Sequence, residues 1–98
     1  MSTDITAAEL KERLANGEKP FILDVREDWE YQEQNIGGLN IPLGTLPDKL
    51  DELEDHKNDE VIVHCRSGAR SASAKAFLQQ QGFTNVRNLT GGILAYNA

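Results

Sequence analysis

The chain has 98 residues, 39% hydrophobic and 27% charged, which is enough for one core, so we expect a single domain over residues 1–98. Its net charge of −6 disfavours nucleic acid as a partner. No apolar run is long enough to cross a bilayer, and residues 1–4 show neither the basic nor the apolar region of a leader. We therefore expect a soluble, cytoplasmic protein that does not bind membranes.

The chain has one cysteine, Cys65, which cannot form an internal disulfide or a CxxC redox pair. The only histidines are His56 and His64, whereas structural zinc sites use four protein ligands. No metal site and no cofactor are expected.

The charges are unevenly distributed along the sequence. Residues 1–60 hold all 16 acidic side chains and 6 basic ones, while residues 61–98 hold four basic side chains and no acidic one. One interpretation is a solvated acidic face. The other is that the half around Cys65 lacks carboxylates because they would repel an anionic substrate.

The first elements are an expected helix and an expected strand. Thr6, with Glu9 three residues later, has the capping-box pattern, and Gly17 is a suitable residue to end that helix. Residues 21–25 form a short apolar run that predicts a buried strand. This strand leads into Arg26, at the end where open α/β sheets place functional groups. The alternative is a strand that simply leaves the core.

Next come shorter elements. Residues 27–34 are polar and predict one or two helical turns, and residues 39–41 predict a short strand. Leu46, Leu50 and Leu53 recur with helical spacing, so an amphipathic helix is expected after Pro47, a good first helical residue.

The second half alternates strands and helices. Residues 60–64 are nearly continuous β-branched residues, which predicts a central strand. A helix is expected over 71–81, with Ala74, Phe77 and Leu78 facing the sheet, then a strand over 85–89 and about one helical turn over 93–96. This alternation predicts an α/β fold with a parallel sheet covered by helices on both faces.

Cys65 lies between the strongest predicted strand and a helix, where a thiolate can be stabilised. Consecutive N–H groups of a short loop can bind an anion, and the following helix directs its positive end at the loop. Arg66 and Arg70 add two cations, and Gly68 lets the backbone curl closely. The alternative is a buried cysteine that acts only as a small hydrophobe.

The spacing separates this loop from a phosphate-binding one. A tyrosine-phosphatase loop has five residues between its cysteine and arginine, whereas Arg70 arrives one residue early. A smaller ring of amides suits one extra sulfur on Cys65 better than a phosphoryl group. His64 precedes the cysteine in a strand and is expected to point to the opposite face, so a Cys–His pair is not expected.

At these residues the chain resembles the rhodanese-like (sulfurtransferase) family, specifically its single-domain members. The matching segments occur in the family's order and span residues 4–96. They are Leu23-Asp24-Val25-Arg26-Glu27 with Trp29-Glu30-Tyr31, Ile36-x-Gly38-x-Asn40-Ile41-Pro42-Leu43, Cys65-Arg66-Ser67-Gly68-Ala69-Arg70-Ser71, and Gly91-Gly92-Ile93-x-Ala95-Tyr96.

The resemblance implies a three-layer α/β fold around a mainly parallel sheet of about five strands, and sulfur transfer through a persulfide on Cys65. Arg66 and Arg70 would attract the anionic donor, and Asp24 and Arg26 would support the loop, with an Asp24–Arg70 ion pair as our hypothesis. The implied substrate-binding residues are Arg66, Ser67, Gly68, Ala69, Arg70 and Ser71.

The implied donor is thiosulfate or another small anionic sulfur donor, and the acceptor is cyanide, a small thiol or a partner protein's thiol. Departures from the family fall on scaffold positions: Gln34-Asn35, Gly37 and Tyr96 replace a usual Gly-His, proline and tryptophan. Two alternatives stay open, a non-enzymatic sulfur-carrier or interaction module and, with less support, a phosphatase or arsenate reductase.

Overall fold

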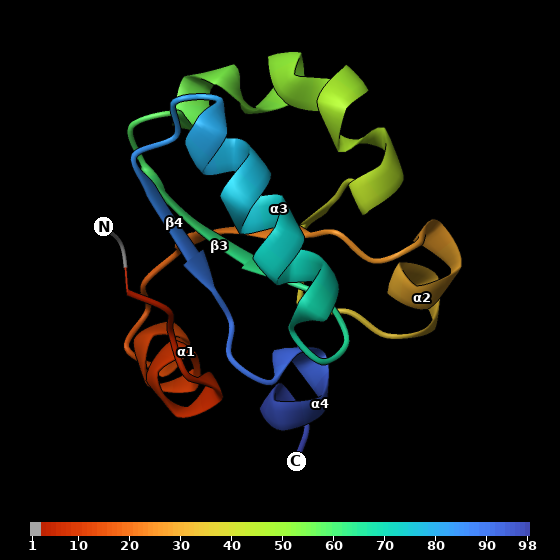
Figure 1. Ribbon diagram of the computed structural model, residues 1–98. Helices are drawn as coiled ribbons and strands as arrows, with labels where there is room; N and C mark the ends of the chain where they lie inside the picture. The colour runs from red at the N-terminus through yellow and green to blue at the C-terminus, as the bar shows by residue number, and fades with distance from the viewer. Residues whose placement is uncertain (1–2) are drawn as a thin grey trace.

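A parallel sheet of four strands lies between two layers of helices in the computed structural model, which describes residues 3–98 (Figure 1). The first two residues, part of the segment in which we expect no leader, lie outside the described residues. The strand order is β2-β1-β3-β4, and each neighbouring pair is parallel. The strands are β1 (Phe21–Asp24), β2 (Leu39–Asn40), β3 (Glu60–His64) and β4 (Asn85–Asn88).

The helices cover both faces of this sheet. They are α1 (Ala7–Ala15), α2 (Asp28–Glu33), the 3₁₀ helix η1 (Leu43–His56), α3 (Ala69–Gln80) and α4 (Gly92–Tyr96). The expected α/β fold with a mainly parallel sheet is therefore confirmed. The sheet has four strands instead of about five, because Ile5 forms only an isolated parallel bridge with Leu89.

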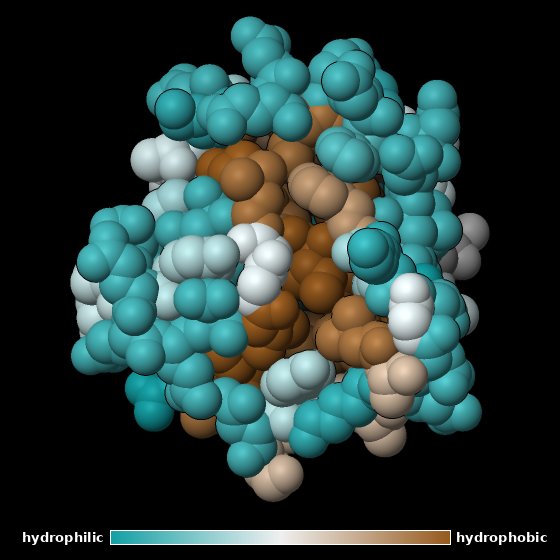
Figure 2. Space-filling model, turned by 180° about the vertical axis from the view of Figure 1, so that it is seen from behind, coloured by the Kyte–Doolittle hydropathy of each residue, from teal (hydrophilic) through white to brown (hydrophobic). Residues whose placement is uncertain are grey.

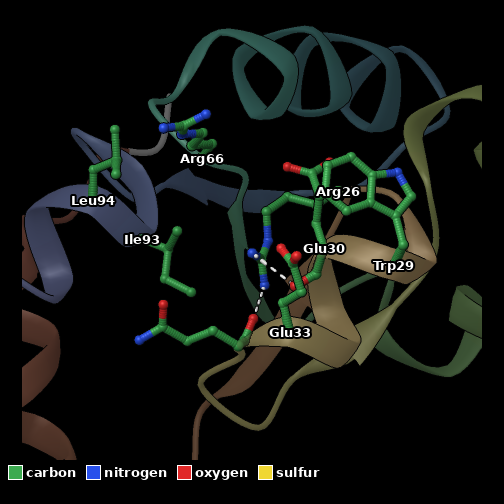
Figure 3. Close-up of a pocket in the computed structure, with 8 residues that line it drawn as sticks. Arg26, Trp29, Glu30, Glu33, Arg66, Ile93 and Leu94 are labelled. Carbon is green, nitrogen blue, oxygen red and sulfur yellow. Dashed lines mark hydrogen bonds between the residues drawn. The ribbon is translucent and has the colours of Figure 1, made fainter.

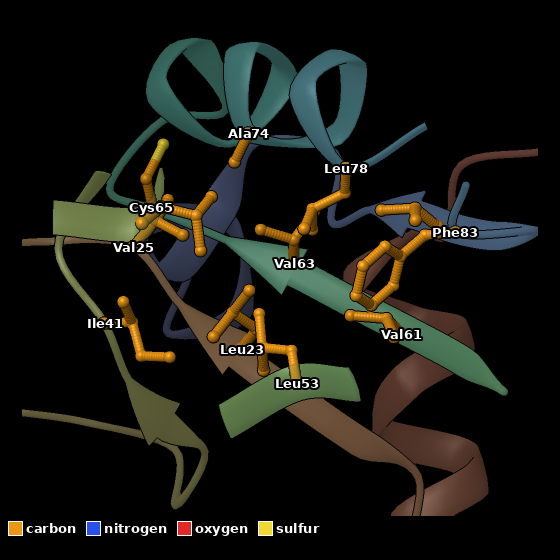
Figure 4. Packing of buried hydrophobic residues seen from close by; sticks show 12 residues of the cluster. Leu23, Val25, Ile41, Leu53, Val61, Val63, Cys65, Ala74, Leu78 and Phe83 are labelled. Carbon is orange, nitrogen blue, oxygen red and sulfur yellow. The ribbon is translucent and has the colours of Figure 1, made fainter. Parts of the chain in front are cut away.

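Alternation along β3 sends side chains into two separate cores. Val61 and Val63 join the larger cluster, which includes Leu53 of η1 and Leu78 of α3 (Figure 4). Ile62 faces the other way, into a smaller cluster beneath α1 and α4. Since β3 pairs with a strand on each side, its nearly continuous apolar sequence is explained by burial on both faces.

The face turned away from the viewer in Figure 1 combines hydrophilic and apolar side chains. Seen from behind, apolar side chains are visible in a hollow band between polar and charged ones (Figure 2). In residues 3–98 no helix combines the length and apolar character that crossing a bilayer requires.

Two elements differ locally from their sequence predictions. Pro47 lies inside η1 and does not begin it, and the segment is 3₁₀ and not α. A proline has no N–H to donate to the carbonyl four residues back, which disfavours a continuous α-helix. The helix α3 begins at Ala69 and not at Ser71, because Gly68 takes a left-handed conformation (φ 111°) and serves as its N-cap. The first turn of α3 therefore forms part of the loop that follows Cys65.

Candidate active site

Cys65 lies at the carboxyl end of the interior strand β3, with its side chain at the edge of the larger core (Figure 4). Its residue surface is only 1% exposed. His64, one residue earlier, points to the opposite face, where its Nε2 lies 3.6 Å from Oδ2 of Asp24. Burial lowers the pKa of His64, which favours the neutral ring. The predicted orientation of His64, on the face opposite to the side chain of Cys65, is confirmed.

Three donors surround the sulfur of Cys65. The backbone N–H groups of Gly68 and Ser71 lie 3.1 and 3.4 Å from Sγ, and the Ser71 hydroxyl oxygen lies 3.4 Å from it. Burial raises the pKa of the Cys65 thiol, but these donors together with the backbone N–H of Ser67 outweigh it and hold that pKa below its ordinary value. The N-terminus of the 12-residue helix α3 adds its positive end to the same place. This arrangement favours a thiolate.

The turn at Gly91 and Gly92 holds the loop from behind. The N–H of Ile93 donates to the Cys65 carbonyl at 3.0 Å, and the N–H of Leu94 donates to the Arg66 carbonyl at 3.1 Å. Gly92 has φ 60°, and a Cβ there would collide with both carbonyls. The glycine is required because the two backbones approach so closely. The start of α4 therefore fixes the loop's first residues.

Arg70 pairs with Glu30 and not with Asp24, so our hypothesis of an Asp24–Arg70 ion pair is wrong. The guanidinium Nη1 and Nη2 lie 2.7 and 3.0 Å from the two oxygens of Glu30. This bidentate contact lowers the pKa of Glu30 to about 2. It joins the first turn of α3 to α2 across 40 residues of sequence.

Asp24 and Arg26 form their own buried pair. The Arg26 Nη2 lies 2.8 Å from Oδ2 of Asp24, and the Arg26 backbone N–H donates to Oδ1 at 2.9 Å. The guanidinium also donates to the carbonyls of Gln34 and Glu30, at 2.6 and 3.4 Å. The two side chains thus hold both ends of the segment that carries α2. Neither side chain hydrogen-bonds to the sulfur; the Arg26 guanidinium instead contacts the backbone carbonyl of Glu30, the residue that pairs with Arg70.

A cavity of about 340 Å³ lies beside the loop, between α2 and α4 (Figure 3). Trp29 and Glu33 of α2 line one side, and Ile93 and Leu94 of α4 line the other. Arg66 lies at the end nearest the loop (Figure 3). The cavity therefore combines apolar walls with charged side chains of both signs.

The four cations of residues 61–98 are not all available to a ligand. Arg70 pairs with Glu30, Lys75 with Asp4 and Arg87 with Glu60, all carboxylates of the first half of the chain. Within residues 3–98, Arg66 is exposed and forms no ion pair. The acid-free second half thus provides one unpaired cation at the loop. Its other charges mainly hold the two halves together.

The sequence analysis did not assign a role at the loop to two nearby residues, Glu30 and Asn88. Glu30 was part of a matching segment but had no assigned role, and its partner is 40 residues away. Asn88 accepts a 2.6 Å hydrogen bond from the Ser71 hydroxyl. It ends β4, so the rule that parallel strands collect functional groups at their carboxyl ends could have identified it. Among the described residues no cluster of three His, Cys, Asp or Glu could hold a metal ion.

Comparison with known proteins agrees with this geometry. The family model for the rhodanese-like domain matches residues 6–98. The chain is 38% identical over 97 residues to a sulfurtransferase of Allochromatium vinosum, covering 98% of this chain and 89% of that protein. It is 37% identical over 70 residues to the thiosulfate sulfurtransferase PspE of Escherichia coli, covering 70% and 67%.

Solved structures share the fold. A rhodanese-like domain protein from Staphylococcus aureus superposes with a TM-score of 0.86 at 33% identity, covering 98% of this chain and 91% of that one. The family match covers nearly the whole described chain, and its one cysteine lies buried in a loop lined with donors. The chain therefore belongs to the rhodanese-like domain family and is a rhodanese-domain sulfurtransferase.

Proposed function

We propose that the protein moves a sulfane sulfur from thiosulfate or a persulfide to a thiophilic acceptor, cyanide or a thiol, through a persulfide on Cys65. The observation that carries this proposal is the set of three donors on Sγ, from Gly68 and Ser71. Such donors stabilise a thiolate, which is the nucleophilic form of cysteine. The name of the Escherichia coli relative supports thiosulfate as the donor.

In the first half-reaction the Cys65 thiolate attacks the outer sulfur of thiosulfate. A new S–S bond forms, the old one breaks, and sulfite leaves with the bonding electron pair. The negative charge of the enzyme then lies on the outer sulfur of the persulfide, close to the N–H groups of Arg66, Ser67, Gly68, Ala69, Arg70 and Ser71. Arg66 attracts the dianionic donor because its charge is unpaired, whereas Arg70 acts mainly by bracing the loop through Glu30.

In the second half-reaction an acceptor attacks the outer sulfur. Cyanide, a small thiolate or a partner protein's thiolate forms a bond to it, and the Cys65 thiolate is regenerated as the leaving group. No second cysteine is present to resolve the persulfide within the chain. The acceptor must therefore come from outside, and the cavity beside Arg66 is the place where we expect it to approach.

Mass spectrometry of the intact protein tests this proposal. After treatment with thiosulfate and removal of excess reagent, the wild-type chain should carry one added sulfur, and cyanide should remove it with release of thiocyanate. The Cys65→Ser variant, which differs by one atom, should gain nothing. An equal gain in the variant, or no gain in the wild type, would overturn the proposal. A loaded protein that no acceptor unloads would instead indicate a carrier.

A further inference from the structure

The Ser71 hydroxyl has more hydrogen-bond acceptors around it than it has protons. Its oxygen lies 2.6 Å from Oδ1 of Asn88, 3.2 Å from the Gly68 carbonyl and 3.4 Å from Sγ of Cys65. Ser71 is fully buried, so water does not satisfy the acceptors that the hydroxyl leaves without a proton. A hydroxyl donates one hydrogen bond at a time. The contact with Asn88 is the shortest of the three, and this favours Asn88 as the acceptor of the single proton when the sulfur carries no charge.

The amide of Asn88 is held so that its oxygen, and not its nitrogen, faces Ser71. Its Nδ2 donates to the Gly68 carbonyl at 3.2 Å, and turning the amide over would bring two oxygens together there. The backbone is fixed as well, since the Asn88 N–H donates to Asp4 and the Asn88 carbonyl accepts from Ile5, both at 3.0 Å. The residue is only 9% exposed. Asn88 is thus a rigid acceptor for the Ser71 proton.

We propose that Asn88 is a positioning residue that competes with the sulfur of Cys65 for the Ser71 hydroxyl proton. In the neutral thiol the hydroxyl donates to Asn88. When Sγ becomes a thiolate, the stronger acceptor draws the hydroxyl away from Asn88, since hydrogen bonds to charged acceptors are the stronger ones. The bond to Asn88 is lost in that state. Asn88 therefore makes the thiolate less favourable than the donors of the loop alone would make it.

Formation of the persulfide returns the Ser71 hydroxyl to Asn88, in a step that rests on the proposed function. When the persulfide forms, the negative charge moves from Sγ to the outer sulfur, and Sγ becomes a weak acceptor. The hydroxyl can then return to Asn88. Asn88 consequently favours the loaded enzyme over the free thiolate, which opposes the back-reaction with sulfite. No atom is gained or lost in this rearrangement, because only the direction of one hydroxyl changes.

The first test measures the thiol without any sulfur donor. Because Cys65 is the only cysteine, the pH dependence of alkylation by iodoacetamide reports its pKa directly. Asn88→Ala should lower that pKa and raise the alkylation rate at a pH below it by roughly three- to tenfold, the range of one hydrogen bond. Asn88→Leu removes the amide while filling the space, and it should give the same result if the alanine variant folds poorly.

A double-variant cycle distinguishes competition for the Ser71 proton from a merely structural role of Asn88. Ser71→Ala removes the hydroxyl and should raise the pKa of Cys65. In the Ser71→Ala background, Asn88→Ala should change that pKa no further. A shift of equal size with and without Ser71, or an increase of the pKa in Asn88→Ala, would overturn the proposal. The ionisable or charged groups around the thiol and around Asn88 are retained in every variant: Arg66, Arg70, Glu30, His64, Asp24, Arg26, Asp4 and Lys75.

The second test measures the loaded state. With fixed concentrations of thiosulfate and sulfite at a pH above the thiol pKa, mass spectrometry gives the ratio of persulfide to free Cys65. Asn88→Ala should lower this ratio by about the factor seen in the alkylation assay. An unchanged ratio would refute the loading half of the proposal. If wild-type Cys65 takes up no sulfur, the proposed function fails, but the alkylation cycle still decides the role of Asn88.

Discussion

Replacing Glu30 by glutamine should remove the ion pair that joins α2 to the first turn of α3, and should destabilise the protein in a pH-dependent way. Glutamine keeps an oxygen that can accept from the Glu27 N–H, a 3.0 Å bond of the wild-type capping box, so the cap is preserved. The change therefore isolates the charge of Glu30. Its guanidinium partner, Arg70, is left without a carboxylate.

The pKa of Glu30 sets the size of the effect. It falls from an ordinary 4.5 to about 2, and each pH unit between two such values corresponds to about 1.4 kcal/mol, which gives an upper limit of about 3 kcal/mol. The Arg70 side chain is 36% exposed, so solvent screens part of this attraction. We expect Glu30→Gln to lower the free energy of unfolding by about 1 to 2 kcal/mol at pH 7.

The sign of the pH dependence follows from the lowered pKa. The contribution of Glu30 is fully present above pH 4.5 and is lost as the pH falls through about 2, because the carboxylate becomes protonated in both the folded and the unfolded chain only below the folded-state pKa. Urea denaturation at several pH values should therefore show a difference between wild type and variant that shrinks below pH 4.5. Glu33→Gln, on the same helix but without an ion pair, is the control and should match wild type. A difference of equal size at pH 7 and pH 2.5 would refute the reasoning.

Three further changes test other parts of the site. Gly92→Ala should destabilise the fold by more than about 2 kcal/mol in thermal denaturation, because its Cβ meets the loop backbone at a positive φ, whereas Gly44→Ala, with open space around it, should not. Arg66→Ala should raise KM for thiosulfate by roughly fivefold and leave an uncharged donor unaffected, since the arginine is an exposed, unpaired charge; equal effects on both donors would contradict this. Glu33→Gln removes a negative charge from the cavity, so it should slow transfer to the cationic thiol cysteamine and speed transfer to the anionic thiol 3-mercaptopropionate, by roughly two- to fivefold each. Transfer to the neutral 2-mercaptoethanol should not change, and the control Asp51→Asn should have no effect. A uniform change across the three thiols would contradict a charge effect in the cavity.

Local patterns in the sequence predicted most of the fold. The capping box at Thr6, the β-branched run of β3 and the glycines that follow α1 and α3 are properties of neighbouring residues, and these elements form within a few residues of their predicted positions. The difference in η1 has a local cause as well, since Pro47 removes a donor that a continuous α-helix needs. The alternation of strands and helices was sufficient to predict the parallel sheet.

The contacts around the loop were less predictable, because they depend on how distant elements pack. The partner of Arg70 is set by the position of α2, a helix of six residues with none buried, whose periodicity gives no information on which side chain faces α3. Asp24 was the carboxylate that we expected to pair with Arg70, but it forms its ion pair with Arg26. Asn88 could have been found from its place at the end of β4, whereas the direction of its amide could not.

The loop that follows Cys65 depends on the short helix α4 for its position. The first two N–H groups of α4 after Gly92 are the donors that hold the Cys65 and Arg66 carbonyls, yet the helix contributes no strand to the sheet and little to the larger core. A proteolytic cut at Thr90 or Gly91 would leave the four strands and α3 intact while releasing both carbonyls. Cleavage there would separate chemistry from folding, because the sheet would persist while the thiol lost its ordered surroundings. Residues 92–98 thus help to hold the loop around Cys65, although none of their side chains donates a hydrogen bond to the sulfur among the described residues 3–98.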